Sequence, residues 1–86
     1  MPVISMFFGI VIRMYYREHE PPHFHAEYAG HDGTFDMTGA VLRGDLESPR
    51  AKRLVRLWAM KHSARLEENW RRAAAGKPLL PIPPLE

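Results

Sequence analysis

Chemically versatile side chains recur at every second position after a pair of prolines. His23, His25 and Glu27 follow Pro21-Pro22. In an extended strand, side chains two positions apart share a face and lie about 7 Å apart, because the chain rises ~3.3 Å per residue. We therefore expect these three side chains on one face of a strand. The intervening side chains, which are apolar, face the other way: these are Phe24, Ala26 and Tyr28.

Imidazole nitrogens in this pattern are suitable ligands for zinc or another first-row divalent metal, and Glu27 adds a carboxylate. His19 precedes His23 by four residues across the proline bend and can supply a further ligand. One hypothesis is therefore a divalent metal site, with zinc as an example, at His19, His23 and His25. A His-x-His pair alone is a weak metal signal.

The same residues support other roles. In metal-free cleavage of a phosphodiester, one histidine acts as general base and another as general acid, while Arg13 stabilises the developing charge and Glu27 assists. The catalytic candidates are then His23, His25, Glu27 and Arg13. In simple RNA contact, Tyr15 and the imidazoles supply stacking and hydrogen bonds. In a structural role, the imidazoles hydrogen-bond the backbone and hold the proline loop. The sequence leaves open whether the protein is an enzyme.

Composition limits the class of protein. The 86 residues fit one domain, 1–86, and contain no cysteine, which excludes disulfides, thiolate metal sites and cysteine nucleophiles. A core this small is often supplemented by a metal or a partner chain, and a homodimer is one form of such a partner. The apolar start, residues 1–12, has no basic leader and is shorter than a membrane span. We expect a cytoplasmic protein that does not contact a membrane.

Charge is unevenly distributed along the chain. Residues 1–47 contain three basic and seven acidic side chains, whereas residues 48–86 contain nine basic and three acidic ones. Several cations gather near the start of a predicted helix, where the helix dipole disfavours them. This clustering favours an acidic partner, either nucleic acid or protein. The alternative is that these basic side chains form a helix face that is exposed to solvent and binds nothing. The candidate binding residues are Arg50, Lys52, Arg53, Arg56 and Tyr15.

The first half of the chain predicts strands. Residues 4–16 are rich in β-branched and aromatic side chains and predict one strand, with a bulge at Gly9. Residues 30–33 form a turn signal between two alternating segments, which predicts a hairpin with a second strand over residues 34–38. Its polar side, Thr34 and Asp36, should share the face of the histidines. A short further strand is expected over residues 41–43.

The second half predicts a helix and a tail. Ser48-Pro49 is a good helix start, and Gly76 is placed to end the helix, which we expect over residues 48–76. Its apolar stripe should cover the sheet, with His62 as a buried core residue. A smaller stripe on the outer side, made of Leu57, Met60 and Ala64, suggests a protein contact. The proline-rich residues 77–86 are too apolar for a solvated tail; we expect them to pack back over the domain, with docking on a partner as the alternative. The stripe facing the sheet comprises Ala51, Leu54, Val55, Trp58, His62, Leu66 and Ala73.

The expected fold is therefore α+β: a small antiparallel sheet of three to four strands packed on one long C-terminal helix, followed by a proline-rich tail. Residues 1–47 form the sheet with the histidine-rich loop, residues 48–76 the helix and residues 77–86 the tail.

The segments Ile12-Arg-Met-Tyr-Tyr and His19-Glu-Pro-Pro-His-Phe-His-Ala-Glu-Tyr closely resemble the bacterial domain-of-unknown-function family 4160. Residues 39–44, the helical segment 54–58, Glu68-Asn-Trp70 and residues 76–79 resemble it as well, so the likeness covers nearly the whole chain. In this sequence Glu18 stands where the family often has aspartate. The resemblance implies no catalytic role for any residue. The genes of this family are arranged similarly to toxin–antitoxin modules, which implies a small protein partner encoded nearby and RNA or DNA as a target. We therefore expect one component of a toxin–antitoxin-like pair that binds a small partner protein. The alternatives are a small histidine-dependent ribonuclease and a non-enzymatic regulator that binds nucleic acid.

Overall fold

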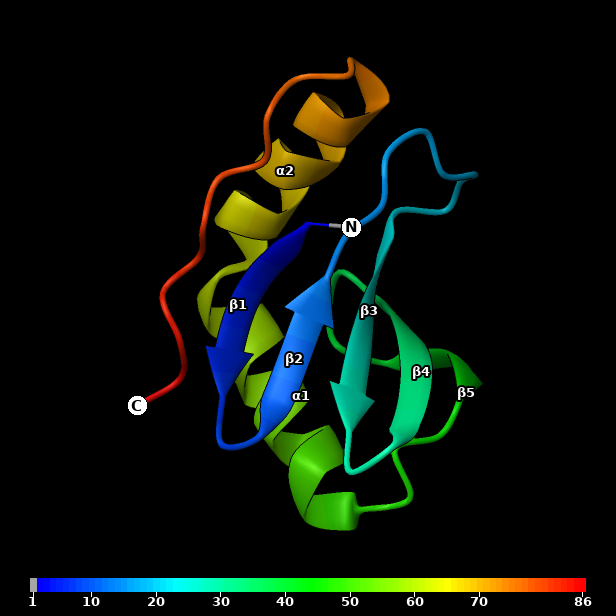
Figure 1. Cartoon of the computed structure of the whole chain (residues 1–86), viewed down its shortest axis with the longest axis vertical. Helices are drawn as coiled ribbons and strands as arrows, with labels where there is room; N and C mark the ends of the chain where they lie inside the picture. Colours follow the sequence, from blue (N-terminus) through cyan, green and yellow to red (C-terminus); the bar gives the residue numbers. More distant parts are fainter. Residues whose placement is uncertain (1) are drawn as a thin grey trace.

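The computed structural model describes residues 2–86 as a five-stranded antiparallel sheet with two helices on one face (Figure 1). The strands lie side by side in chain order. They are β1 (Val3–Phe7), β2 (Ile10–Arg13), β3 (His23–Tyr28), β4 (His31–Asp36) and β5 (Val41–Gly44). The helices are α1 (Pro49–Lys61) and α2 (Ser63–Ala74). The α+β class is confirmed. Neither helix in the described part of the chain is long and apolar enough to cross a membrane.

The prediction of three to four strands was wrong, because residues 4–16 form a hairpin instead of one bulged strand. The chain reverses at Phe8-Gly9, where both residues have positive φ, +50° and +79°. Phe7 then pairs with Ile10 across this two-residue turn. Such a turn requires positive φ at both central positions, and phenylalanine rarely adopts it. The turn therefore carried no ordinary sequence signal.

The second hairpin turn also lies earlier than predicted. Ala29 and Gly30 have φ of +52° and +84°, and Tyr28 pairs with His31. β4 therefore begins at His31 and includes most of the segment that we expected to be the turn. The pairing of the two polar faces is nevertheless as expected, since His25 lies opposite Thr34 and His23 lies opposite Asp36.

The prediction of one long helix was also wrong. The start is confirmed: the Ser48 hydroxyl accepts a hydrogen bond from the Ala51 N–H at 3.0 Å, and Pro49 is the first helical residue. The helix is interrupted at His62, whose φ and ψ of −119° and 29° are not helical. The buried stripe continues across the interruption, from Trp58 through His62 to Leu66, so periodicity alone gave no sign of it.

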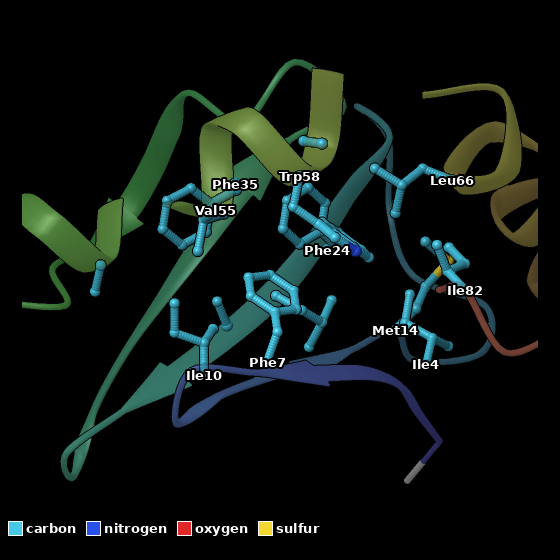
Figure 2. Close-up of a cluster of buried hydrophobic side chains, with 14 of the residues drawn as sticks. Ile4, Phe7, Ile10, Met14, Phe24, Phe35, Val55, Trp58, Leu66 and Ile82 are labelled. Carbon is cyan, nitrogen blue, oxygen red and sulfur yellow. The ribbon is translucent and has the colours of Figure 1, made fainter. Parts of the chain in front are cut away.

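Aromatic packing joins the helices to the sheet (Figure 2). Trp58 of α1 is completely buried, with its ring centroid 5.4 Å from that of Phe7 and 5.6 Å from that of Phe24. Phe24 in turn stacks on Phe35 at 5.6 Å. The face of the sheet that carries Phe24 and Phe35 is therefore covered by helix, and the face that carries the histidines is the opposite one.

The proline-rich tail packs back over the domain as expected, and it runs beside β1 and α2 in Figure 1. Ile82 is buried, and its N–H donates to the Ile4 carbonyl at 2.8 Å. The Trp58 indole N–H donates to the Pro83 carbonyl at 2.9 Å. Asn69, 1% exposed, binds both backbone groups of Leu80 with its side-chain amide, at 2.8 and 2.9 Å. The tail thereby covers the β1 edge of the sheet, whereas no other strand of residues 2–86 pairs with the outer edge of β5.

Asn69→Ala should lower the free energy of unfolding by about 1–3 kcal/mol, because it removes both hydrogen bonds that hold the tail at Leu80. Urea unfolding followed by circular dichroism measures this. Glu67→Ala, at an exposed position of the same helix, is the matched control and should change the stability by less than about 0.5 kcal/mol. Equal stability of the two variants would show that Asn69 does not fasten the tail.

Candidate functional site

A cluster of one carboxylate and two imidazoles lies on the uncovered face of the sheet. Oε1 of Glu18 is 3.3 Å from Nε2 of His23 and 3.2 Å from Nε2 of His25. The two rings meet edge to face, with centroids 5.3 Å apart. The side chains are 32%, 13% and 28% exposed, respectively, so solvent reaches all three. We call Glu18, His23 and His25 the EHH cluster.

Two different parts of the chain build the EHH cluster. β3 supplies His23 and His25 by its two-residue alternation, which buries Phe24 and Ala26 on the other side as predicted. Glu18 comes from the loop between β2 and β3, which folds back so that its carboxylate reaches both rings. Burial alone would raise the pKa of Glu18, but hydrogen bonds and charge interactions with the two histidines hold it below its ordinary value. Glu18 is therefore an ionised carboxylate at neutral pH.

Each imidazole is also held on its other side. The Nδ1–H of His23 donates to the Pro21 carbonyl at 2.8 Å, because a carbonyl oxygen can only accept. Nδ1 of His25 lies 3.5 Å from the hydroxyl oxygen of Thr34 on β4. Tyr15 meets the His25 ring edge to face at 4.5 Å between centroids. These contacts point the Nε2 atoms of both rings toward Glu18.

Helix α2 reaches the same cluster through a tryptophan. The ring centroids of Trp70 and His23 are 5.1 Å apart, and the Trp70 indole N–H donates to Glu20 at 3.4 Å. Our sequence analysis missed both Glu18 and Trp70 as site residues. Only Glu18 had a local signal, an acidic residue immediately before His19 and the proline bend. The position of Trp70 depends on tertiary packing, which no local pattern reports.

The predicted site residues are only partly brought together. His19 lies in the wall of the neighbouring groove but is not among the EHH ligand atoms, which all lie within 4.8 Å of one another. Arg13 sits beside His25 on β2, and its Nη1 donates to Glu27 at 2.6 Å. Glu27 therefore neutralises Arg13 and does not join the cluster.

Two large hollows flank His25 on the open face. One, of about 330 Å³, contains the Arg13–Glu27 ion pair and Tyr15. The other is a groove of about 390 Å³ between the loop and β5. We call the second hollow the β5 groove; its lining residues are Glu18, His19, Glu20, Pro21, His23, His25, Thr34, Leu42 and Arg43. A bound molecule in either hollow would contact His25.

The cationic residues of the helix lie elsewhere. α1 covers the face of the sheet opposite the histidines, so its outer side is remote from the EHH cluster. Lys52 pairs with Asp45 at 3.1 Å, and Arg50 lies over the Phe8 ring at 5.9 Å. Arg53 and Arg56 are exposed. These four residues and Tyr15, which we predicted as one binding set, therefore belong to two separate surfaces.

His62 is a core residue, as the sequence predicted. It is 8% exposed and packs on Trp58, with ring centroids 5.9 Å apart. Its Nε2 has no hydrogen-bond partner among residues 2–86. Burial lowers the pKa of His62 below its ordinary value, and the positive charges of Lys61 and Arg65 act in the same direction.

Comparison with known proteins gives one match. The family model described as Domain of unknown function (DUF4160) matches residues 9–71. The chain belongs to this family. The matched region contains the entire EHH cluster and Trp70, while β1 and the tail lie outside it. No curated protein and no solved structure matches the chain.

Buried His62 should make stability depend on pH. In the unfolded chain its pKa returns to about 6.5, so the unfolded state binds the proton more readily and the free energy of unfolding falls as pH drops below ~6.5. His62→Leu should remove this part of the pH dependence, as measured by urea unfolding between pH 8 and pH 5.5. His31→Gln, at an exposed histidine, is the control. If the pH dependence of stability is unchanged in His62→Leu, burial of His62 is not its cause.

Proposed function

We propose that this protein cleaves phosphodiester bonds in RNA at the EHH cluster. Cleavage requires a group that accepts the proton of the attacking 2′-hydroxyl and positive charge that stabilises the phosphate as it is attacked. The observation that carries the proposal is the convergence of two imidazole nitrogens on one carboxylate oxygen in an open groove. An imidazole can take the proton of a hydroxyl near neutral pH and so act as the general base.

Arginine side chains line both hollows beside His25. Arg43 lines the β5 groove and is exposed, and it lies opposite Thr34 in the sheet. Arg13 lies on the other side, where its ion pair with Glu27 holds its side chain beside His25. Tyr15 adds an aromatic edge at the same place, suited to contact with a base. A single-stranded substrate crossing the sheet at His25 would therefore meet an arginine in each hollow.

His25→Ala should reduce RNA cleavage by at least about 100-fold, because His25 is the member of the EHH cluster that borders both hollows. Cleavage of a fluorescent single-stranded RNA is measured with purified protein, with and without added divalent metal. His31→Ala, at an exposed histidine outside the cluster, should retain full activity. The proposal fails if the wild-type protein does not cleave RNA, or if cleavage survives His25→Ala.

A second function, binding of a small partner protein in a toxin–antitoxin-like module, is favoured by the geometry of β5. All four residues of this edge strand are exposed, including Val41 and Leu42 at 45% and 47%. A free strand edge can pair with a strand of another protein. Leu42 and Arg43 also form one wall of the β5 groove. A partner paired with β5 would thus cover the groove and control access to the EHH cluster.

Leu42→Glu should weaken this partner complex, because it places a charge on the pairing edge. The protein is co-expressed with the product of the neighbouring gene, and the complex is measured by size-exclusion chromatography. Leu57→Glu, which changes an equally exposed leucine on α1, should leave the complex intact. Absence of a complex with the wild-type protein would refute partner binding, and loss of the complex in Leu57→Glu alone would place it on the helix.

A further inference from the structure

We propose that the EHH cluster binds one divalent transition-metal ion through Oε1 of Glu18 and the Nε2 atoms of His23 and His25. The inference rests on the proposed function in that it names the cofactor of the same site. Its three ligands differ from the set that the sequence suggested, because Glu18 takes the place of His19.

The spacing of the three atoms fits a metal ion. Zinc binds imidazole nitrogen and carboxylate oxygen at about 2.0–2.2 Å, so two ligand atoms in tetrahedral geometry lie ~3.4 Å apart. The carboxylate oxygen of Glu18 lies 3.3 and 3.2 Å from the two imidazole nitrogens. All three ligand atoms lie within 4.8 Å of one another, so a single ion between them can be reached by each side chain.

The orientation of His23 points to the same conclusion. Its Nδ1 lies 2.8 Å from the Pro21 carbonyl, which can only accept, so Nδ1 carries a hydrogen. Its Nε2 is thereby directed at Oε1 of Glu18, which Nε2 of His25 also approaches. A metal ion placed between these three atoms would be bound by all of them at once.

The contacts outside the cluster are those that metal-binding histidines ordinarily have. Such a histidine donates its second N–H to a carbonyl, carboxylate or similar acceptor, which fixes the tautomer and the ring orientation. The Pro21 carbonyl has this role for His23, and the Thr34 hydroxyl lies near the corresponding nitrogen of His25. The Trp70 ring packs on His23 and restricts it further.

The ligand set selects the class of metal. Two imidazoles with one carboxylate suit zinc, cobalt or iron(II), whereas magnesium and calcium prefer oxygen ligands only. Three protein ligands leave at least one coordination position free, and the cluster opens into the β5 groove. A divalent ion lowers the pKa of a bound water toward neutrality. An ion held by Glu18, His23 and His25 would thus supply a base for the proton of the 2′-hydroxyl; the O2′–P bond would form as the P–O5′ bond breaks, and the leaving oxygen would take a proton from solvent.

The test is metal binding by the full-length protein, prepared without an affinity tag and stripped with a chelator. Isothermal titration with Zn²⁺ and visible absorption with Co²⁺ should both show one ion per chain. Glu18→Gln and His25→Ala should each weaken binding at least tenfold, with folding checked by circular dichroism. His19→Ala and His31→Ala are the matched histidine controls and should bind as the wild type does. Mg²⁺ should not compete.

Two results would overturn the metal site: no Zn²⁺ binding tighter than about 100 µM, or binding that is equally strong in Glu18→Gln and His25→Ala. Binding by His19 or His31 would appear as a loss in those controls and would also overturn it. The outcome is independent of RNA cleavage. Metal binding without cleavage would refute only the proposed function, whereas cleavage that is lost in His25→Ala, by a protein that does not bind Zn²⁺, would refute only the metal site.

Discussion

The burial of Phe24 is the interaction on which the rest of the structure depends. Phe24 is completely buried between Phe35 and Trp58, with ring centroids 5.6 Å from each. Because β3 alternates with a period of two, this contact sends His23 and His25 to the opposite face. A one-residue slip of β3 would bury both imidazoles and expose Phe24, at a cost of about 1.5–3 kcal/mol for the lost phenylalanine burial alone. The core thus fixes the direction in which the site faces.

Features that depend on neighbouring residues could be predicted from the sequence. The alternation of β3, the Ser48-Pro49 helix start and the burial of His62 all follow from residue types at fixed spacings. The turn at Phe8-Gly9 could not be predicted, because phenylalanine at positive φ is held there by the packing of the strands on either side. For the candidate site, the histidine pair could be predicted but its carboxylate could not, since Glu18 lies in a loop whose path depends on the rest of the fold.

The distribution of charge has a structural explanation that the sequence did not reveal. The acidic first half and the basic second half correspond to the two layers of the molecule, sheet and helices. Lys52 of α1 forms an ion pair with Asp45, which follows the sheet in the chain. Within the sheet, Arg13 of β2 forms an ion pair with Glu27 of the neighbouring strand β3. The remaining cations of α1 point away from the sheet. An acidic partner attracted to α1 would therefore bind on the side opposite the EHH cluster.

The loop that carries Glu18 connects the candidate site to the stability of the whole domain. Its Pro21 carbonyl orients His23, and its Glu20 accepts a hydrogen bond from Trp70 of α2. The helix α2 is held in place by the tail, through Asn69 and Leu80. Loosening of the tail would therefore reach His23 through α2 and Trp70 without any change in the cluster itself. In a domain of this size the site has no separate support, so the packing that stabilises the fold also sets the geometry of Glu18, His23 and His25.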